Sequence, residues 1–487
     1  MAAYPPKKKE PEAYKIMYGN FPNETHRKVY RPLLPDNHGY QVQLFFSDHV
    51  IEAKLNNFTS FGFNLNVDSQ FDEFCFPGQV TVIQFSPAKS LEYNIKAQII
   101  EMERTGDELR LSLRVMTDRF LEEDQYQTIA LASSHPLSGE ISHPFNYKTA
   151  SFFEVKEVSR DRLVVTGIHQ DFTLFENMEI NFTLGMFQPS SAISGNASKI
   201  SLQADGKIEC TIKLNRSLPK ALIDHLNKYL MRYTSASPEK IRSAGFKVLS
   251  IKEFINYRFV ETQADYEAVL RTRRFAYSGV EKVSSDADLK SVSYFFDDYS
   301  HILMVMHNEE IIGSATIIKG NGQNQPFEIE TFFDEDNPIK LPPADETIEV
   351  AALCLHPEYR DTDILHGIFE QIFILMMMLN KNYIIASSDE FLIKLYQSIG
   401  FELTPYTFIQ PKYNDLKMSV LIVPKEAALE SKNVKKLIWW PLWGLVTKHI
   451  RERRIIKTSA NQRIRSKLLE RLFKTFFFLR YRRRWKD

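Results

Sequence analysis

Two arginines four residues apart near the start of the chain, Arg27 and Arg31, could form a site for an anionic nucleotide. A guanidinium group can fork onto phosphate oxygens or a guanine edge, and it can stack flat on a purine ring. Asn57 and Thr59 lie two positions apart, so on a β-strand their side chains project from the same face. Gly62 lets the backbone bend or approach a ligand closely. The alternative is a solvated N-terminal segment, because paired arginines also occur in any basic stretch.

The residues around these positions have the pattern of antiparallel strands. Segments 40–46, 55–67 and 76–82 are rich in Val, Phe and Thr, and Asn, Pro and Gly separate them. Alternating strand residues between such turns are typical of an antiparallel barrel. We therefore predict a barrel whose rim carries the two arginines and the Asn57–Gly62 turn.

RxxxR followed by D/N-x-S-x-x-G resembles the signature of the PilZ domain, the bacterial receptor for cyclic-di-GMP. Thr59 replaces the serine of that motif and keeps its hydroxyl group. The resemblance implies a PilZ-like domain over residues 23–125. It also implies that Arg27, Arg31, Asn57, Thr59 and Gly62 bind cyclic-di-GMP.

Residues 140–253 look like a weak internal repeat of the first domain. Residues 175–182 align with 76–83, and Glu157, Ser159 and Arg162 stand where Asn57, Thr59 and Gly62 stand in the first copy. No RxxxR precedes them within this copy, so we predict a degenerate PilZ-like barrel with a packing or dimerising role. A helical period at 219–231 closes this half.

From residue 254 to 427 the pattern changes to alternating helices and strands, which indicates an α/β domain. The pattern predicts helices at 263–277 and 363–379 and a third that ends at Gly400. It predicts a hairpin of strands 302–306 and 311–318, a central strand at 347–355 and a strand at 383–387.

Three segments of this domain, 310–316, 353–360 and 391–401, resemble the GNAT acyltransferase fold in the right order. Within that fold, 270–275 followed by 296–303 resembles the long-chain N-acyl amino acid and acyl-homoserine lactone synthases. The resemblance implies that a fatty acyl group moves from a thioester, carried by acyl carrier protein or coenzyme A, to an amine.

An amine that attacks a thioester needs a base, donors for the developing oxyanion and an acid for the leaving thiolate. Glu349 on the central strand is the candidate base, and backbone N–H groups near Leu353 and Leu355 could polarise the carbonyl. Tyr396 matches the tyrosine that protonates the thiolate in many GNAT enzymes. Alternatively, Glu349 is a strand-end carboxylate and Tyr396 packs in the core.

The loop that binds pyrophosphate in the family departs from its pattern here. Arg360 is retained as an acyl-donor contact, but Asp363 and Leu365 replace a glycine and a small residue. Aspartates in an anion cradle repel phosphate. Thr316 and Ala352 also stand where the N-acyl amino acid synthases usually carry arginines. Either the donor is carried by a protein, or the domain has lost its activity.

The composition favours a cytoplasmic protein of roughly three domains in 487 residues. The three cysteines are far apart and lack zinc spacing, so we expect no disulfide framework and no metal. Residues 1–22 are polar and lack the apolar region of a signal peptide, and we expect them to be flexible. The longest apolar run, 437–446, is too short to cross a bilayer, which takes about 20 residues.

The net charge is zero but unevenly distributed. Residues 431–487 carry 18 Lys and Arg against 3 Asp and Glu, so the rest of the chain has an equal acidic excess. Tryptophans at 439, 440 and 443 and an amphipathic period over 466–480 lie in this basic tail, residues 428–487. The pattern favours peripheral docking on the anionic inner membrane. The alternatives are a helix packed on the acidic body, or nucleic acid, although no nucleic-acid module accompanies the tail.

These observations together predict two antiparallel β-barrels, an α/β GNAT-like domain and a basic helical tail. The predicted function is a bacterial cyclic-di-GMP sensor coupled to N-acylation near the membrane. The rival hypothesis is a non-enzymatic effector whose GNAT-like domain is a protein-interaction scaffold.

Overall fold

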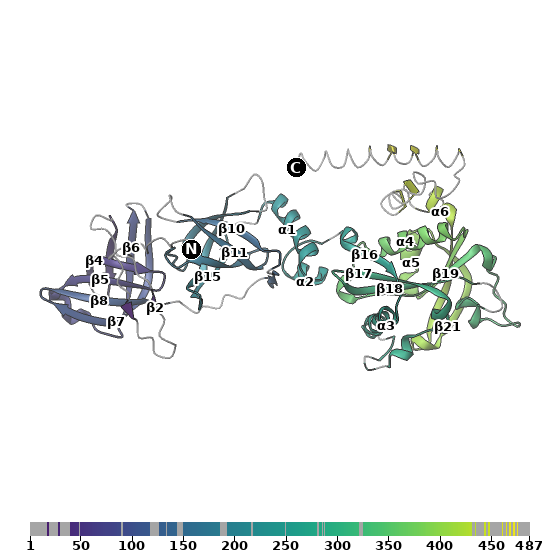
Figure 1. Ribbon diagram of the computed structural model, residues 1–487, viewed down its shortest axis with the longest axis horizontal. Helices are drawn as coiled ribbons and strands as arrows, with labels where there is room; N and C mark the ends of the chain where they lie inside the picture. The colour runs from purple at the N-terminus through teal and green to yellow at the C-terminus, as the bar shows by residue number, and fades with distance from the viewer. Residues whose placement is uncertain are drawn as a thin grey trace, which may run out of the picture. The chain divides into compact units, whose positions relative to one another are not determined.

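The computed structural model describes most of residues 39–430, with gaps at 48, 89–90, 117–125, 133, 144–149, 186–191, 216–217, 249, 280–281, 285, 287 and 321–324. It also describes 17–18, 28–29 and scattered positions from 434 to 475. The chain forms two compact units (Figure 1). The first contains Met1–Ala236 and Lys240–Lys247, and the second contains Ser237–Glu239 and Val248–Asp487. Each is described separately.

The first unit begins with a closed six-stranded antiparallel barrel in the order β3-β4-β5-β8-β7-β6. Its strands are β3 (Gln41–Phe45), β4 (Val50–Thr59), β5 (Gly62–Asp68), β6 (Val80–Ala88), β7 (Leu91–Thr105) and β8 (Glu108–Val115). Apolar side chains alternate into the core, as Phe63, Leu65 and Val67 do on β5. A short pair, β1 (Met17–Tyr18) with β2 (Lys28–Val29), precedes it. The predicted barrel is confirmed.

A second six-stranded barrel follows in the same unit. Its strands are β10 (Leu137–Ser142), β11 (Ala150–Val158), β12 (Arg162–His169), β13 (Glu179–Leu184), β14 (Ile193–Leu202) and β15 (Lys207–Leu214). The barrel closes because β10 pairs with both β11 and β13, and β9 (Ile129–Ala130) adds to its edge at β11. Around this barrel the order is β10-β11-β12-β15-β14-β13. When the strands of each barrel are numbered from its first strand, both barrels therefore have the order 1-2-3-6-5-4.

This shared topology confirms the internal repeat. The fourth strand begins at Val80 in one barrel and Glu179 in the other, positions that the sequence alignment equates. After the second barrel come α1 (Lys220–Tyr233), as the helical period predicted, and α2 (Pro238–Ser243).

The second unit is built on a seven-stranded mixed sheet in the order β16-β17-β18-β19-β20-β22-β21. Its strands are β16 (Ile255–Phe259), β17 (Ser300–His307), β18 (Glu310–Ile318), β19 (Thr347–Leu355), β20 (Tyr383–Ser388), β21 (Glu402–Gln410) and β22 (Leu416–Pro424). Helix α3 (Gln263–Ser278) covers one face, and α4 (Ile364–Met378) and α5 (Glu390–Ser398) cover the other (Figure 1). A short helix, α6 (Lys425–Glu430), follows.

Local chemistry explains where these helices lie. Helix α3 begins at a capping box, in which Thr262 and Asp265 satisfy each other's backbone N–H groups. Helix α4 packs closely on the sheet at Gly367, where a Cβ atom would lie 1.9 Å from the Tyr257 hydroxyl oxygen. Only glycine permits that approach. The helix, hairpin and strand predictions for this domain agree with the structure to within a few residues.

The central strands β19 and β20 diverge, and they are the only parallel neighbours among the described strands. They pair from Thr347–Tyr383 to Val350–Ala386 and no further. Beyond that point β19 stays paired with β18, whereas β20 stays paired with β22. Ala352, with a φ of 47°, marks a bulge against β18. The result is a wedge between the two strands.

Candidate functional sites

The predicted nucleotide motif lies at the turn between β4 and β5. Asn57 and Thr59 are buried at the end of β4, and Phe58 between them points into the barrel core. The two polar side chains therefore project outward together. The Thr59 hydroxyl accepts a hydrogen bond from Phe61 N at 3.2 Å, and Gly62 opens β5. Arg27 and Arg31 lie outside the described residues.

A polar network continues from this turn across the outer face of β4, β5 and β8. Asn64 accepts hydrogen bonds from Asn56 at 3.1 Å and from Arg110 Nε at 3.2 Å, and it donates to Ser112. Asn57 Oδ1 is buried but accepts no hydrogen bond from the described residues. Motif matching missed Asn64, Arg110 and Ser112, although the two-residue alternation of their strands would have placed them on one face.

In the second barrel the equivalent turn is occupied by the chain itself. Strand β9, which precedes that barrel, pairs with β11 at Glu157 and Val158. Thr128 donates to Glu157 at 2.5 Å, and Arg162 donates to the Tyr126 carbonyl at 3.2 Å. The groups that replace the nucleotide motif therefore bind this leader segment, residues 126–130.

Glu349 lies on the α3 face of the sheet, fully buried. Its carboxylate accepts hydrogen bonds from the backbone N–H groups of Glu328 at 2.6 Å and Ile329 at 3.2 Å. Burial, and then the charge of Glu328, raise the pKa of Glu349 well above its ordinary value.

Glu328 and Lys412 add ionisable groups beside Glu349 that the sequence analysis did not identify. Burial raises the pKa of Glu328 to about 7, against the opposing charge of Lys412. Burial lowers the pKa of Lys412 to about 8. Gln410 donates to Glu328 at 3.0 Å, and Lys412 Nζ lies 3.5 Å from the centre of the Tyr294 ring. Groups with pKa values near 7 suit acid–base catalysis.

A buried ion pair joins the two segments that resemble the acyl amino acid synthases. The Arg273 side chain is 0% exposed and bonds Asp297 twice, at 2.8 and 3.1 Å. It also donates to Thr316 on β18 at 2.6 Å, and Tyr266 donates to Asp297 at 2.9 Å. The pair thus holds α3 to the sheet and to the short helix η4 (Phe295–Tyr299).

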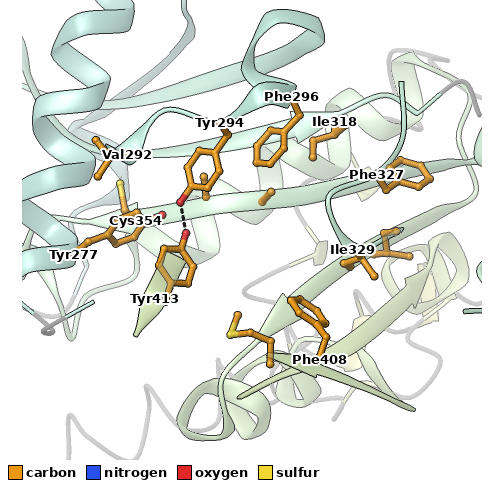
Figure 2. Packing of buried hydrophobic residues seen from close by; sticks show 14 of the residues in the cluster. Tyr277, Val292, Tyr294, Phe296, Ile318, Phe327, Ile329, Cys354, Phe408 and Tyr413 are labelled. Carbon is orange, nitrogen blue, oxygen red and sulfur yellow. Dashed lines mark hydrogen bonds between the residues drawn. The ribbon is translucent and has the colours of Figure 1, made fainter. Parts of the chain in front are cut away.

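Figure 2 shows a cluster of buried hydrophobic residues in this unit, in which the hydroxyl groups of Tyr294 and Tyr413 hydrogen-bond to each other. Tyr277 of α3 and Cys354 of the diverging part of β19 lie beside them. All four side chains are buried. Leu353 and Leu355, on either side of Cys354, are half-buried.

Tyr396 lies on the opposite side of the sheet from Glu349. It belongs to α5, is 5% exposed, and packs edge-on against Phe369 and Phe401 with ring centres 5.7 and 5.1 Å away. Burial raises its pKa above the ordinary value. The structure therefore places the predicted base and the predicted acid on different faces of the sheet.

In the loop at the start of α4, the side chain of Asp363 points toward residues 250–252. The Asp363 carboxylate accepts hydrogen bonds from Ile251 N at 2.7 Å, Lys252 N at 3.1 Å and Ser250 Oγ at 2.7 Å. Arg360 donates to the Ala276 carbonyl at 3.5 Å. A carboxylate fixed at this position disfavours a bound pyrophosphate.

The loop after α3 spans the open end of the wedge. Gly279 lies against Pro357, which follows β19, and Lys282 forms an ion pair at 3.2 Å with Asp389, which follows β20. A surface hollow of about 550 Å³ lies beside this loop. Its lining residues are Phe275, Ser278, Gly279, Val283, Ser284, Pro357 and Asn414.

Residues 270–370 match the acetyltransferase (GNAT) domain family. Solved structures with a similar fold include FeeM, an N-acyl amino acid synthase from uncultured soil microbes, with 11% identity and a TM-score of 0.29, covering 41% of this chain and 97% of that one. Escherichia coli ElaA has 12% identity and a TM-score of 0.25, covering 35% of this chain and 99% of that one. An acetyltransferase from Streptococcus agalactiae also has 12% identity and a TM-score of 0.25, covering 35% of this chain and 99% of that one. No curated protein matches the chain. The second unit thus contains a GNAT-like acyltransferase domain.

Arg273→Ala should destabilise the second unit by about 3–5 kcal/mol, because it leaves Asp297 charged, buried and unpaired. Arg258→Ala is the matched control. Its guanidinium is 45% exposed in the ion pair with Asp265, and we expect a loss of at most about 1 kcal/mol. Urea unfolding followed by tryptophan fluorescence measures both. Equal losses in the two variants would contradict the importance of the buried pair.

Proposed function

We propose that the chain is a cyclic-di-GMP receptor of the PilZ type that controls an N-acyltransferase domain. The observation that carries the receptor assignment is the turn at the end of β4, where Asn57 and Thr59 face outward beside a buried polar network. Asn57 Oδ1 needs a donor, and a guanine base offers N–H groups. Arg27 and Arg31 supply the two cations that the ligand's two phosphates require.

Arg27→Ala/Arg31→Ala should weaken cyclic-di-GMP binding by at least 100-fold, since each charge-assisted contact contributes about 1.5–3 kcal/mol. Isothermal titration calorimetry on the full chain measures this loss. Arg104→Ala is the control, because Arg104 lies on the same barrel in an exposed ion pair with Asp72. Unchanged affinity in the double variant would remove the two arginines from the site.

The acyltransferase domain supplies the output of this receptor. In the proposed reaction the amine nitrogen attacks the thioester carbonyl carbon, the C–S bond breaks, and an amide and a free thiol form. Glu349 and Glu328 are the groups through which the amine proton leaves, and they are neighbours in the same buried site. Backbone N–H groups near Leu353 and Leu355, in the wedge, polarise the carbonyl. Tyr396 is the proposed donor to the thiolate.

The donor that fits this site best is a long-chain acyl thioester on acyl carrier protein. Asp363 fixes a carboxylate in the loop that, by its resemblance to the family, would bind the pyrophosphate of coenzyme A. A carrier protein avoids that repulsion, because its prosthetic arm has one phosphate rather than a nucleotide and its phosphates.

Incubation with acyl carrier protein thioesters, free amino acids and cyclic-di-GMP should give an acylated amine, detected by mass spectrometry. Glu328→Gln and Glu349→Gln should each lower the rate by about 10²–10⁴. Glu370→Gln is the control, because Glu370 pairs with Lys252 at 2.7 Å, away from this site. Wild-type rates in both active-site variants would refute their role.

The rival function is a non-enzymatic effector with the GNAT-like domain as a scaffold. It is favoured by the same Asp363 bonds and by the Lys282–Asp389 pair across the wedge. Neither acylated product nor thioester hydrolysis, with or without nucleotide, would support it.

We also propose that the basic tail attaches the protein to an anionic membrane surface. Ile464, Leu468 and Leu472 are four residues apart and 56–60% exposed, beside Lys467 and Arg471. A basic amphipathic helix with the period of residues 466–480 would lie in the membrane interface. Trp443 takes no part, because it is buried and donates to the Ile399 carbonyl at 3.2 Å. Among the described residues no helix is long and apolar enough to cross a bilayer.

Leu468→Gln/Leu472→Gln should lower binding to phosphatidylglycerol vesicles by at least tenfold, because it removes the apolar stripe but no charge. Co-sedimentation at two salt concentrations measures this. Phosphatidylcholine vesicles should bind weakly in every case. The paired control is Phe391→Gln/Leu392→Gln, which changes exposed apolar residues elsewhere. A wild-type chain that remains in the supernatant with anionic vesicles would refute the attachment.

A further inference from the structure

The turn that carries the nucleotide motif is also held by the second barrel. Ser60, between the β4 and β5 strands, is 4% exposed, and its Oγ accepts a buried hydrogen bond from Leu174 N at 2.9 Å. Leu174 belongs to the segment between β12 and β13 of the second barrel. One side of the turn thus presents Asn57 and Thr59, and its tip bonds to the neighbouring barrel.

The aromatic residue next to Leu174 completes the core of the first barrel. Phe175 is 1% exposed and stacks on Phe63 with ring centres 5.4 Å apart. It also lies 6.3 Å from Phe58 and 5.8 Å from Phe85. Phe58 stands between Asn57 and Thr59 in the sequence, so this packing fixes the strand end that carries both.

The second barrel shows what fills the equivalent turn in a copy that lacks the nucleotide motif. Its leader segment satisfies Glu157 and Arg162. The described part of the first barrel leaves Asn57 Oδ1 without a donor at the corresponding place. The second barrel is therefore a self-filled copy, and the contact that it offers the first barrel is the Leu174–Phe175 segment.

We propose that Ser60 is a positioning residue for cyclic-di-GMP, and that Leu174 and Phe175 couple nucleotide binding to the joint between the two barrels. This inference rests on the proposed receptor function. A turn that is already held in one conformation loses little further conformational entropy when its polar groups bind a ligand. By linkage, a ligand that prefers one conformation of the turn also prefers one arrangement of the joint.

Calorimetry on the full chain tests the positioning role. Ser60→Ala should weaken cyclic-di-GMP binding by about tenfold, the loss of roughly one hydrogen bond. Ser198→Ala should bind as the wild type does. This control removes a hydroxyl that donates to the Thr211 carbonyl within the second barrel. Phe175→Leu keeps an apolar side chain in the core and should also weaken binding.

A distance measurement tests the coupling, which a merely structural role would not affect. Spin labels at Glu101→Cys on the first barrel and Ala204→Cys on the second are both exposed, whereas all three native cysteines are buried. Cyclic-di-GMP should shift or narrow the label distance in the otherwise wild-type chain. It should do neither when Ser60→Ala is added.

Wild-type affinity and an unchanged distance response in both Ser60→Ala and Phe175→Leu would overturn the inference. That outcome differs from failure of the receptor assignment. If the wild-type chain released no heat with cyclic-di-GMP, the receptor function and this inference would fall together.

Discussion

The second unit depends on the ion pair between Arg273 and Asp297. Taking two charges out of water is costly, and the pair tolerates it because both carboxylate oxygens accept guanidinium bonds. Tyr266 and the backbone N–H of Tyr294 complete the shell of Asp297. Because Arg273 sits near the end of α3, the pair also fixes where the following loop crosses the wedge. The apolar core could pack without these charges, so their value lies in orientation.

The two barrels show how one topology can support different uses. Both bring their second and third strands together in a turn on the outer face. In the first barrel this turn has polar side chains, and Asn57 Oδ1 has no donor among the described residues, whereas in the second barrel the turn binds residues 126–130. The difference comes from the segment before each barrel. The segment before the second barrel pairs with β11 and fills its turn, whereas the segment before the first barrel carries Arg27 and Arg31.

The architecture could be predicted because its signals are local. Two-residue alternation defines the barrel strands, and the hairpin, strand and helix pattern from 300 to 400 defines the α/β domain. Contacts between distant segments could not be predicted. Glu328 and Lys412 are 84 positions apart and belong to no motif. The placement of Tyr396 across the sheet from Glu349 follows from which face each element covers, which spacing along the chain does not encode.

The contact between Ser60 and Leu174 was hidden for the same reason, since it joins residues 114 positions apart. The signature that residues 57–62 resemble specifies the positions on either side of Ser60 and leaves the position of Ser60 free to vary. A residue at such a variable position can form contacts that are specific to one protein. These contacts link the binding motif to the rest of that protein's structure.

The indole of Trp443 has a practical consequence for where the acyltransferase-like domain ends. It packs at a tilt against Phe373 of α4, with ring centres 5.0 Å apart, and donates to the Ile399 carbonyl at the end of α5. A protein that ended after β22 would expose Phe373 on α4. It would also leave the Ile399 carbonyl oxygen without the hydrogen bond that Trp443 donates. Trp443, 19 residues beyond the end of β22, therefore belongs to the folded body, although composition alone would assign it to the tail.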